Sequence, residues 1–134
     1  MTRPLIVVQD SRETFSPPWS PDIEVERAEL ECANYSVRGM TASVAYKVFW
    51  SLDDMCASLD RDRQAFDVMV RRLTAYRNRV LIVVGGTTYT EAERYVIHLA
   101  LDSGLVACWP ANAMGATGMM AWHFRRLARL QELN

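Results

Sequence analysis

A run of five consecutive apolar residues, Val80–Val84, lies between Arg79 and the pair Gly85-Gly86. A strand that is apolar at every position has both faces buried, whereas a half-exposed strand alternates apolar and polar residues. Glycine then ends the run, because it accepts the backbone conformations that tight turns need. The run therefore predicts a central strand of a sheet that has helices on both faces.

Other segments carry strand patterns as well. Leu5–Val8 predicts a buried first strand whose carboxyl end delivers Asp10 to a site. Ser11–Pro21 contains three prolines and is expected to be a loop, because each proline removes a backbone donor and fixes φ. Further strands are expected at Ile23–Leu30, which alternates apolar and polar residues, at Tyr35–Arg38, at Ala42–Trp50 and at Leu105–Trp109.

Three segments carry helix patterns. The first begins at Ser51, with Ser51 as the N-cap and Asp54 three residues later, and its apolar stripe continues to Leu73. The second is expected over Thr90–Asp102, with Gly104 as its stop, and the third from roughly Met114 to Leu133. This order predicts an α/β fold in which a three-layer mixed β-sheet is flanked by helices, in a single domain of residues 1–134.

The charge of the chain limits how it meets nucleic acid. The net charge of its 134 residues is −1, so a nucleic-acid contact requires a local basic patch. From Arg61 onward ten basic residues stand against six acidic ones, and Lys47 is the only lysine of the chain. The candidate DNA-binding residues are Arg71, Arg72, Arg125, Arg126 and Arg129.

Three cysteines, Cys32, Cys56 and Cys108, stand far apart. An odd count without CxxC spacing argues against a disulfide framework and against a zinc site. No segment is long enough and apolar enough to span a bilayer, and the N-terminus lacks a secretory pattern. We therefore expect a soluble, cytoplasmic protein with no membrane partner.

An ordered series of motifs resembles the XPF-type nuclease domain of structure-specific DNA-repair endonucleases, which has a restriction-endonuclease-like fold. The series starts with Asp10-Ser11-Arg12-Glu13 after the first strand and continues with a short strand entry that ends in Tyr35. A longer strand then runs into Ser51-Leu52-Asp53-Asp54, and a helix with the charged pairs Asp60-Arg61-Asp62-Arg63 follows. The resemblance covers roughly residues 4 to 86 by motif and the remainder by element order.

The resemblance implies a metal-dependent phosphodiesterase site, from which this sequence departs. Where the family has Gly-Asp, this chain has Ala33-Asn34. Where the family has Glu-Arg-Lys, this chain has Val48-Phe49-Trp50, or Lys47-Val48-Phe49 in the alternative register. After the Val80–Val84 strand the family has an acidic residue, whereas this chain has Gly85-Gly86.

Four residues of the family pattern survive as a vestigial catalytic set: Asp10, Arg12, Glu13 and Asp54. Of these, Asp10 and Asp54 are the candidate metal ligands, with weak binding or none, because Mg²⁺ and Mn²⁺ need several oxygen ligands. No cofactor is expected, apart from Mg²⁺ or Mn²⁺ if the protein is active. Three of these four also have a structural interpretation: Asp54 completes a helix cap, Asp10 closes a strand, and Arg12 pairs with Glu13 or Asp54.

Three functions follow from these residues. The first is a catalytically degenerate nuclease-fold protein in DNA repair, recombination or phage DNA metabolism, which binds branched or flapped DNA or pairs as a homodimer or heterodimer with a nuclease-fold subunit. The second is an active Mg²⁺- or Mn²⁺-dependent endonuclease, in which Asp10, Glu13 and Asp54 hold the metal and Lys47 replaces the lost lysine. The third is a protein-interaction module that mimics a repair domain, suggested by the acidic strip Glu24, Glu26, Glu29 and Glu31.

Overall fold

A single mixed sheet of six strands organises the computed structural model, which describes residues 4–85 and 90–132. In spatial order the strands are β2 (Glu24–Ala28), β1 (Ile6–Asp10), β3 (Tyr35–Val37), β4 (Val44–Phe49), β5 (Asn78–Val83) and β6 (Val106–Cys108). β3 runs antiparallel to both of its neighbours, while the other three pairs are parallel. The Val80–Val84 run thus supplies most of a central strand, as its composition predicts.

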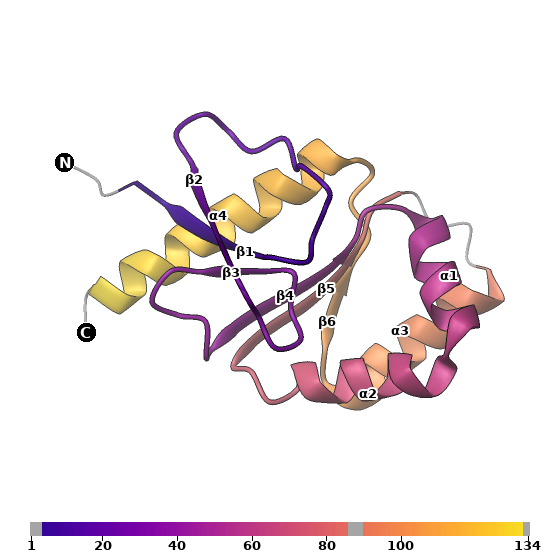
Figure 1. Ribbon diagram of the computed structural model, residues 1–134. Coiled ribbons are helices and arrows are strands. Elements are labelled where there is room, and N and C mark those ends of the chain that lie inside the picture. The colour runs from indigo at the N-terminus through magenta and orange to yellow at the C-terminus, as the bar shows by residue number, and fades with distance from the viewer. Residues whose placement is uncertain (1–3, 86–89, 133–134) are drawn as a thin grey trace.

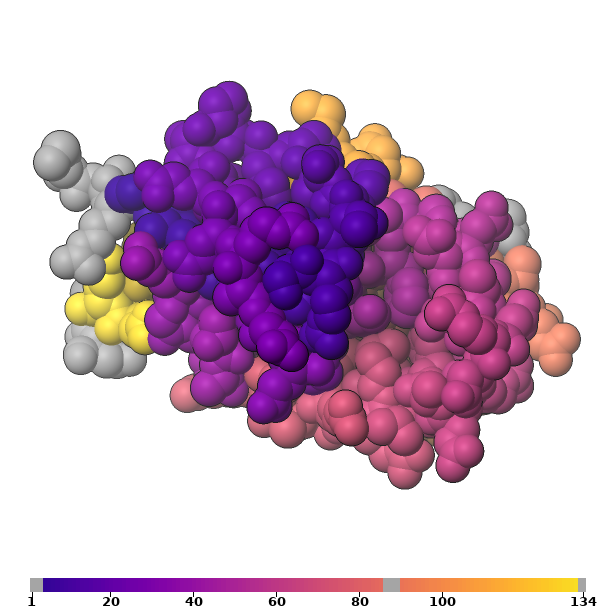
Figure 2. All heavy atoms as spheres, in the orientation of Figure 1, coloured from indigo at the N-terminus to yellow at the C-terminus, as the bar shows by residue number. Residues whose placement is uncertain are grey.

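Helices cover both faces of this sheet, which confirms the predicted three-layer α/β fold (Figure 1). The helices are α1 (Leu52–Arg61), α2 (Arg63–Leu73), α3 (Glu91–Ser103) and α4 (Ala113–Glu132). α1, α2 and α3 pack on one face and α4 on the other. In the space-filling view, the indigo and violet region of β1 to β3 lies beside the magenta and pink region of α1 and α2 (Figure 2). Among the described helices, none is long and apolar enough to cross a membrane.

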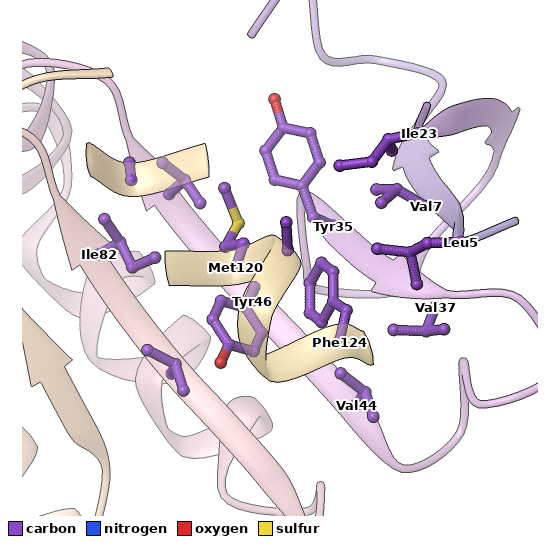
Figure 3. Close-up of a cluster of buried hydrophobic side chains, with 14 of the residues drawn as sticks. Leu5, Val7, Ile23, Tyr35, Val37, Val44, Tyr46, Ile82, Met120 and Phe124 are labelled. Carbon is purple, nitrogen blue, oxygen red and sulfur yellow. The ribbon is translucent and has the colours of Figure 1, made fainter. Parts of the chain in front are cut away.

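The core under α4 is built from alternate residues of the strands. Tyr35 is fully buried beside Phe124 and Met120 of α4, and Val7 approaches from β1 (Figure 3). Tyr46 packs edge-on against Phe124, with 4.9 Å between the ring centroids. Side chains along a strand point alternately to its two faces, so the strand residues between those of this core face the helices on the opposite side of the sheet.

That second core lies between the sheet and α1, α2 and α3. From the sheet it takes residues such as Val8, Ala45 and Leu81, and from α2 it takes Phe66 and Val70. In β4, Lys47 lies two residues from both Ala45 and Phe49, and in β1, Asp10 lies two residues from Val8, so each is on the same face of its strand as these core residues. Both polar side chains therefore face the layer of α1 and α2, and they stand near the carboxyl ends of their strands.

The expectation of one helix from Ser51 to Leu73 is wrong. The chain breaks at Asp62, which is extended (φ −159°, ψ 93°) and ends α1 while its carboxylate caps α2 by accepting from the Ala65 N–H. The apolar stripe continues through the break, because both helices bury their apolar residues in the same core. Periodicity alone therefore does not reveal the two helix axes.

The predicted starts of α1 and α3 and the predicted stop of α3 agree with the structure, whereas Leu133, the expected end of the last helix, lies outside the described residues. Ser51 caps α1 by accepting from the Asp54 N–H, and Thr90 forms a capping box with Glu93 at the start of α3. Gly104 ends α3 with φ 69°, in the left-handed region that favours glycine.

Candidate functional site

A cleft of about 770 Å³ opens between the carboxyl ends of β1 and β4 and one side of α2. From the sheet side it is lined by Asp10, Glu13 and Lys47, and from α2 by Gln64 and Arg72. The sheet side belongs to the indigo and violet region of Figure 2, and α2 belongs to the pink region that meets it. Of the surviving family residues, the fold thus brings Asp10, Arg12 and Glu13 to one cleft.

Asp10 is held in this cleft by contacts that occupy its carboxylate. Its side chain accepts from the Leu30 N–H at 3.0 Å and from two nitrogens of Arg12 at 3.0 and 3.3 Å. Arg12 also donates to the Leu30 carbonyl at 2.5 Å, so the three residues form a closed network. The expected pairing of Arg12 with Glu13 or Asp54 is therefore wrong, because the buried carboxylate two residues away is the nearer partner.

The charge of Asp10 is stabilised by this network. Asp10 is 5% exposed, and burial by itself would raise the pKa of its carboxyl. The hydrogen bonds from Leu30 and Arg12 and the positive charge of Arg12 outweigh that effect and hold the pKa below its ordinary value. Asp10 is consequently an anion that already has its counter-ion.

Asn34, at a position where the family pattern has an aspartate, is also fully engaged. Its amide nitrogen donates to Glu13 Oε2 at 3.0 Å, and its oxygen accepts from the Val48 N–H at 2.8 Å. The other Glu13 oxygen accepts from the Phe15 N–H at 3.0 Å. Asn34 therefore joins the β1 loop to β4 and fixes the Glu13 carboxylate in the cleft.

Lys47 extends from β4 into the cleft without an ion pair to any described residue. Its ammonium nitrogen lies 5.2 Å from the centroid of the Phe49 ring. Burial lowers the pKa of Lys47, and the charges of Glu13 and Asp10 offset this only in part.

Apolar side chains occupy the end of β4, where the family pattern has Glu-Arg-Lys. Val48 is buried under α4, and Phe49 stacks on Phe66 of α2 with 5.8 Å between the centroids. Trp50 stacks on Phe15 at 4.4 Å and lines a second, smaller cleft of about 410 Å³. Asp54 lines this second cleft and not the one that contains Asp10.

These residues do not fit a divalent ion. Asp10 is neutralised by Arg12, Asn34 offers its oxygen to a backbone N–H, and Asp54 lines a different cleft. Within residues 4–85 and 90–132, no three Asp, Glu, His or Cys side chains are grouped so that they could hold a metal. Gly85, at the position of the expected acidic residue, has φ 122° and no side chain to offer, and Gly86 lies outside the described residues.

The candidate DNA-binding arginines fall into two groups on opposite layers of the fold. Arg71 and Arg72 are exposed at the end of α2, and Arg72 lines the larger cleft. Arg125, Arg126 and Arg129 belong to α4, on the other face of the sheet. Arg125 already pairs with Asp22 at 2.7 Å. The five arginines therefore do not form one patch.

Sequence reasoning did not assign roles to two further residues at the clefts. Cys32 lines the larger cleft and contacts the hydroxyl of Tyr76, and burial raises the pKa of its thiol, so it stays protonated. Phe15, from the proline-rich loop, covers Trp50. No local pattern indicates either contact, because each joins segments that are far apart in the sequence.

The comparisons with known proteins rest on structure alone. No family model matches the chain, and no curated protein matches it by sequence. The solved structures that match include XPF from Aeropyrum pernix and the same protein in complex with DNA, each at a TM-score of 0.68 and 22% identity. The matches cover 94% and 97% of this chain but only 61% and 66% of those chains. The six-stranded mixed sheet and its flanking helices therefore have the fold of the XPF nuclease.

Proposed function

We propose that this chain is a catalytically degenerate nuclease-fold protein that binds branched or flapped DNA without cutting it, in DNA repair, recombination or phage DNA metabolism. The observation that carries the proposal is the closed network of Asp10, Arg12 and Leu30 at the place where the resemblance expects a metal ligand. A carboxylate that is neutralised by an arginine attracts a divalent cation weakly, because the cation must displace that arginine first.

The end of β4 supports the same proposal. Hydrolysis of a phosphodiester needs charged groups directed at the phosphate, and each lost group typically costs about 10²–10³-fold in rate. Val48, Phe49 and Trp50 supply none, and their side chains are used for packing.

The DNA-binding part of the proposal places the duplex on the face with the larger cleft. One of the similar structures is a complex with DNA, which favours this ligand. Arg72 lines this cleft and Arg71 stands exposed beside it on α2, and arginine binds phosphate oxygens with two parallel hydrogen bonds. In this arrangement Arg126 and Arg129, on the opposite layer, contribute less.

A binding assay with two charge-matched variants tests this placement. Arg71→Gln/Arg72→Gln and Arg126→Gln/Arg129→Gln each remove two positive charges. We expect the first to weaken binding of forked DNA by about tenfold or more and to reduce the salt slope by about 2, because counter-ion release scales with phosphate contacts. Equal effects of the two variants would contradict the placement.

A cleavage assay tests the loss of activity. We expect no product from forked or flapped DNA in Mg²⁺ or Mn²⁺, for the wild-type protein and for Asp10→Ala alike. Product that appears with the wild-type protein and vanishes with Asp10→Ala would support the active endonuclease and refute degeneracy.

We also infer a second role, pairing with another nuclease-fold chain, from the β6 end of the sheet. Among the described strands β6 pairs only with β5, so its outer edge has no strand partner. Val106 of β6 is 57% exposed, and Leu101 in the last turns of α3 is 70% exposed. An unpaired edge beside exposed apolar side chains is typical of a surface for another chain.

Sedimentation measurements test this pairing. Val106→Lys should shift a dimer toward the monomer, because it places a charge on the proposed contact. Val68→Lys, on the exposed face of α2, is the matched control and should leave the distribution unchanged. A wild-type protein that stays monomeric, both alone and with nuclease-fold partners, would refute the pairing.

A further inference from the structure

Lys47 combines three features that the proposed function does not use. It is the only lysine of the chain, and it lines both the larger and the smaller cleft. No hydrogen bond or ion pair ties its amine to a described residue. A half-buried lysine that lines a cleft in this way offers a free amine to a ligand.

The surroundings of Lys47 explain why its neighbours leave it free. The Asp10 carboxylate is paired with Arg12, and Glu13 accepts from Asn34 and from the Phe15 N–H. The Phe49 ring provides an apolar wall 5.2 Å away. Burial lowers the pKa of Lys47, which increases the fraction of neutral amine, and only the neutral amine has the lone pair of a nucleophile.

We propose that Lys47 forms an imine with an aldehyde, and that the aldehyde is the ring-opened sugar of an abasic site in DNA. The nitrogen lone pair attacks the C1′ carbonyl carbon, and a proton moves from nitrogen to oxygen to give a carbinolamine. Loss of the hydroxyl group with the second amine proton releases water and leaves a C=N bond. The reaction needs no oxidant, reductant or metal ion.

The choice of aldehyde rests on the proposed function, since it assumes that DNA occupies this face. An abasic sugar lacks the base, so it enters a narrow cleft without the unstacking cost of flipping a nucleotide. The smaller cleft measures about 410 Å³, and its wall beside Lys47 has the rings of Phe15 and Trp50 together with polar groups such as Thr14, so it suits a sugar that is polar at its hydroxyl groups and apolar on its face. Lys47 also lines the larger cleft, so a phosphate next to the sugar can enter that cleft, whose lining includes Arg72.

Borohydride trapping tests the inference, because reduction converts the imine into a stable amine. In one arm the protein is incubated with 2-deoxyribose 5-phosphate, in the other with a duplex that contains one abasic site. We expect one adduct in each arm, mapped to Lys47 by peptide mass spectrometry. Lys47→Arg should lose this adduct, and its melting temperature and DNA affinity are measured alongside so that loss of the amine is separated from loss of fold or of binding. The N-terminal amine serves as an internal reference for background labelling.

The two arms separate failure of this inference from failure of the proposed function. No labelling of Lys47 by the sugar phosphate above the N-terminal background refutes the inference, and so does a bound abasic duplex that gives no adduct. If the duplex is not bound but the sugar phosphate labels Lys47, DNA binding is refuted and the reactivity of Lys47 stands. Arg72→Gln is the matched variant: it should weaken trapping of the duplex at limiting protein more than trapping of the free sugar phosphate, because the duplex offers a phosphate on each side of the sugar and the free sugar offers one.

Discussion

Replacement of Asp10 by asparagine probes the buried network at the end of β1. The asparagine side chain would keep an oxygen for the Leu30 N–H but would remove the negative charge that Arg12 contacts. A hydrogen bond to a charged group contributes roughly 1.5–3 kcal/mol and a neutral one about 1 kcal/mol. We therefore expect Asp10→Asn to lower the free energy of unfolding by about 1 kcal/mol. Asp10→Ala should lower it by about 2 to 3 kcal/mol, because it also leaves the Leu30 N–H without an acceptor.

The pH dependence of this loss provides a second readout. The pKa of Asp10 is lower in the folded protein than its ordinary value of 3.8, so the unfolded chain takes up the proton first as the pH falls. The stability that the charge contributes is complete above the ordinary value and disappears as the pH falls through the folded value. The difference between wild type and Asp10→Asn should therefore vanish in strong acid.

Urea unfolding followed by tryptophan fluorescence measures both effects, since Trp50 and Trp19 pack near this end of the sheet. Asp10→Asn as stable as wild type at neutral pH would refute the reasoning. So would a difference that persists unchanged below the folded pKa of Asp10, because the loss would then come from packing and not from charge.

Three other changes test the helix ends and the α4 layer. Asp62→Ala should destabilise the protein by about 1 kcal/mol in urea unfolding, because α2 loses its N-cap. Gly104→Ala should cost about 1 kcal/mol in the same assay, because φ 69° strains any residue with a Cβ; an unchanged midpoint would show that the turn relaxes. Burial lowers the pKa of His123 below 6.5, so the unfolded chain binds its proton first and thermal stability should fall as the pH drops through that value. His123→Gln should reduce this dependence of the melting temperature on pH, and an unaltered dependence would mean that other groups cause it.

The sequence predicts the layers of the fold well, because each layer follows from local apolar patterns. Val80–Val84 indicates a strand with both faces buried, and Thr90 with Glu93 marks a helix start by a chemical signature that the structure reproduces. The break at Asp62 escapes prediction because the apolar stripe is continuous across it. The sequence signal for this break is Asp62 itself, because aspartate is a good N-cap and can start a new helix within a continuous apolar stripe.

The site is less predictable than the fold. Of the four residues in the predicted set, Asp10, Arg12 and Glu13 line one cleft and Asp54 lines another, and the partners of the first three come from elsewhere in the chain. Leu30 is 20 residues from Asp10, and Asn34 is 21 residues from Glu13. Pairings of this kind depend on how the strands align, and sequence periodicity contains no information about them. Likewise, five arginines counted as one group prove to lie on two layers, because α2 and α4 cover opposite faces.

The two edges of the sheet differ in the side chains that they present to solvent. Along β2, the exposed Glu24 and the ion pair of Glu26 with Arg38 stand on either side of Val25, which is 41% exposed, so an incoming strand there would have to displace hydrated charge. The β6 edge has Val106, which is 57% exposed, and no charged residue in the strand. If two chains pair through the β6 edge as proposed above, the charged β2 edge of each then disfavours the addition of a third sheet. Crowding of such molecules should therefore yield closed pairs rather than open-ended polymers.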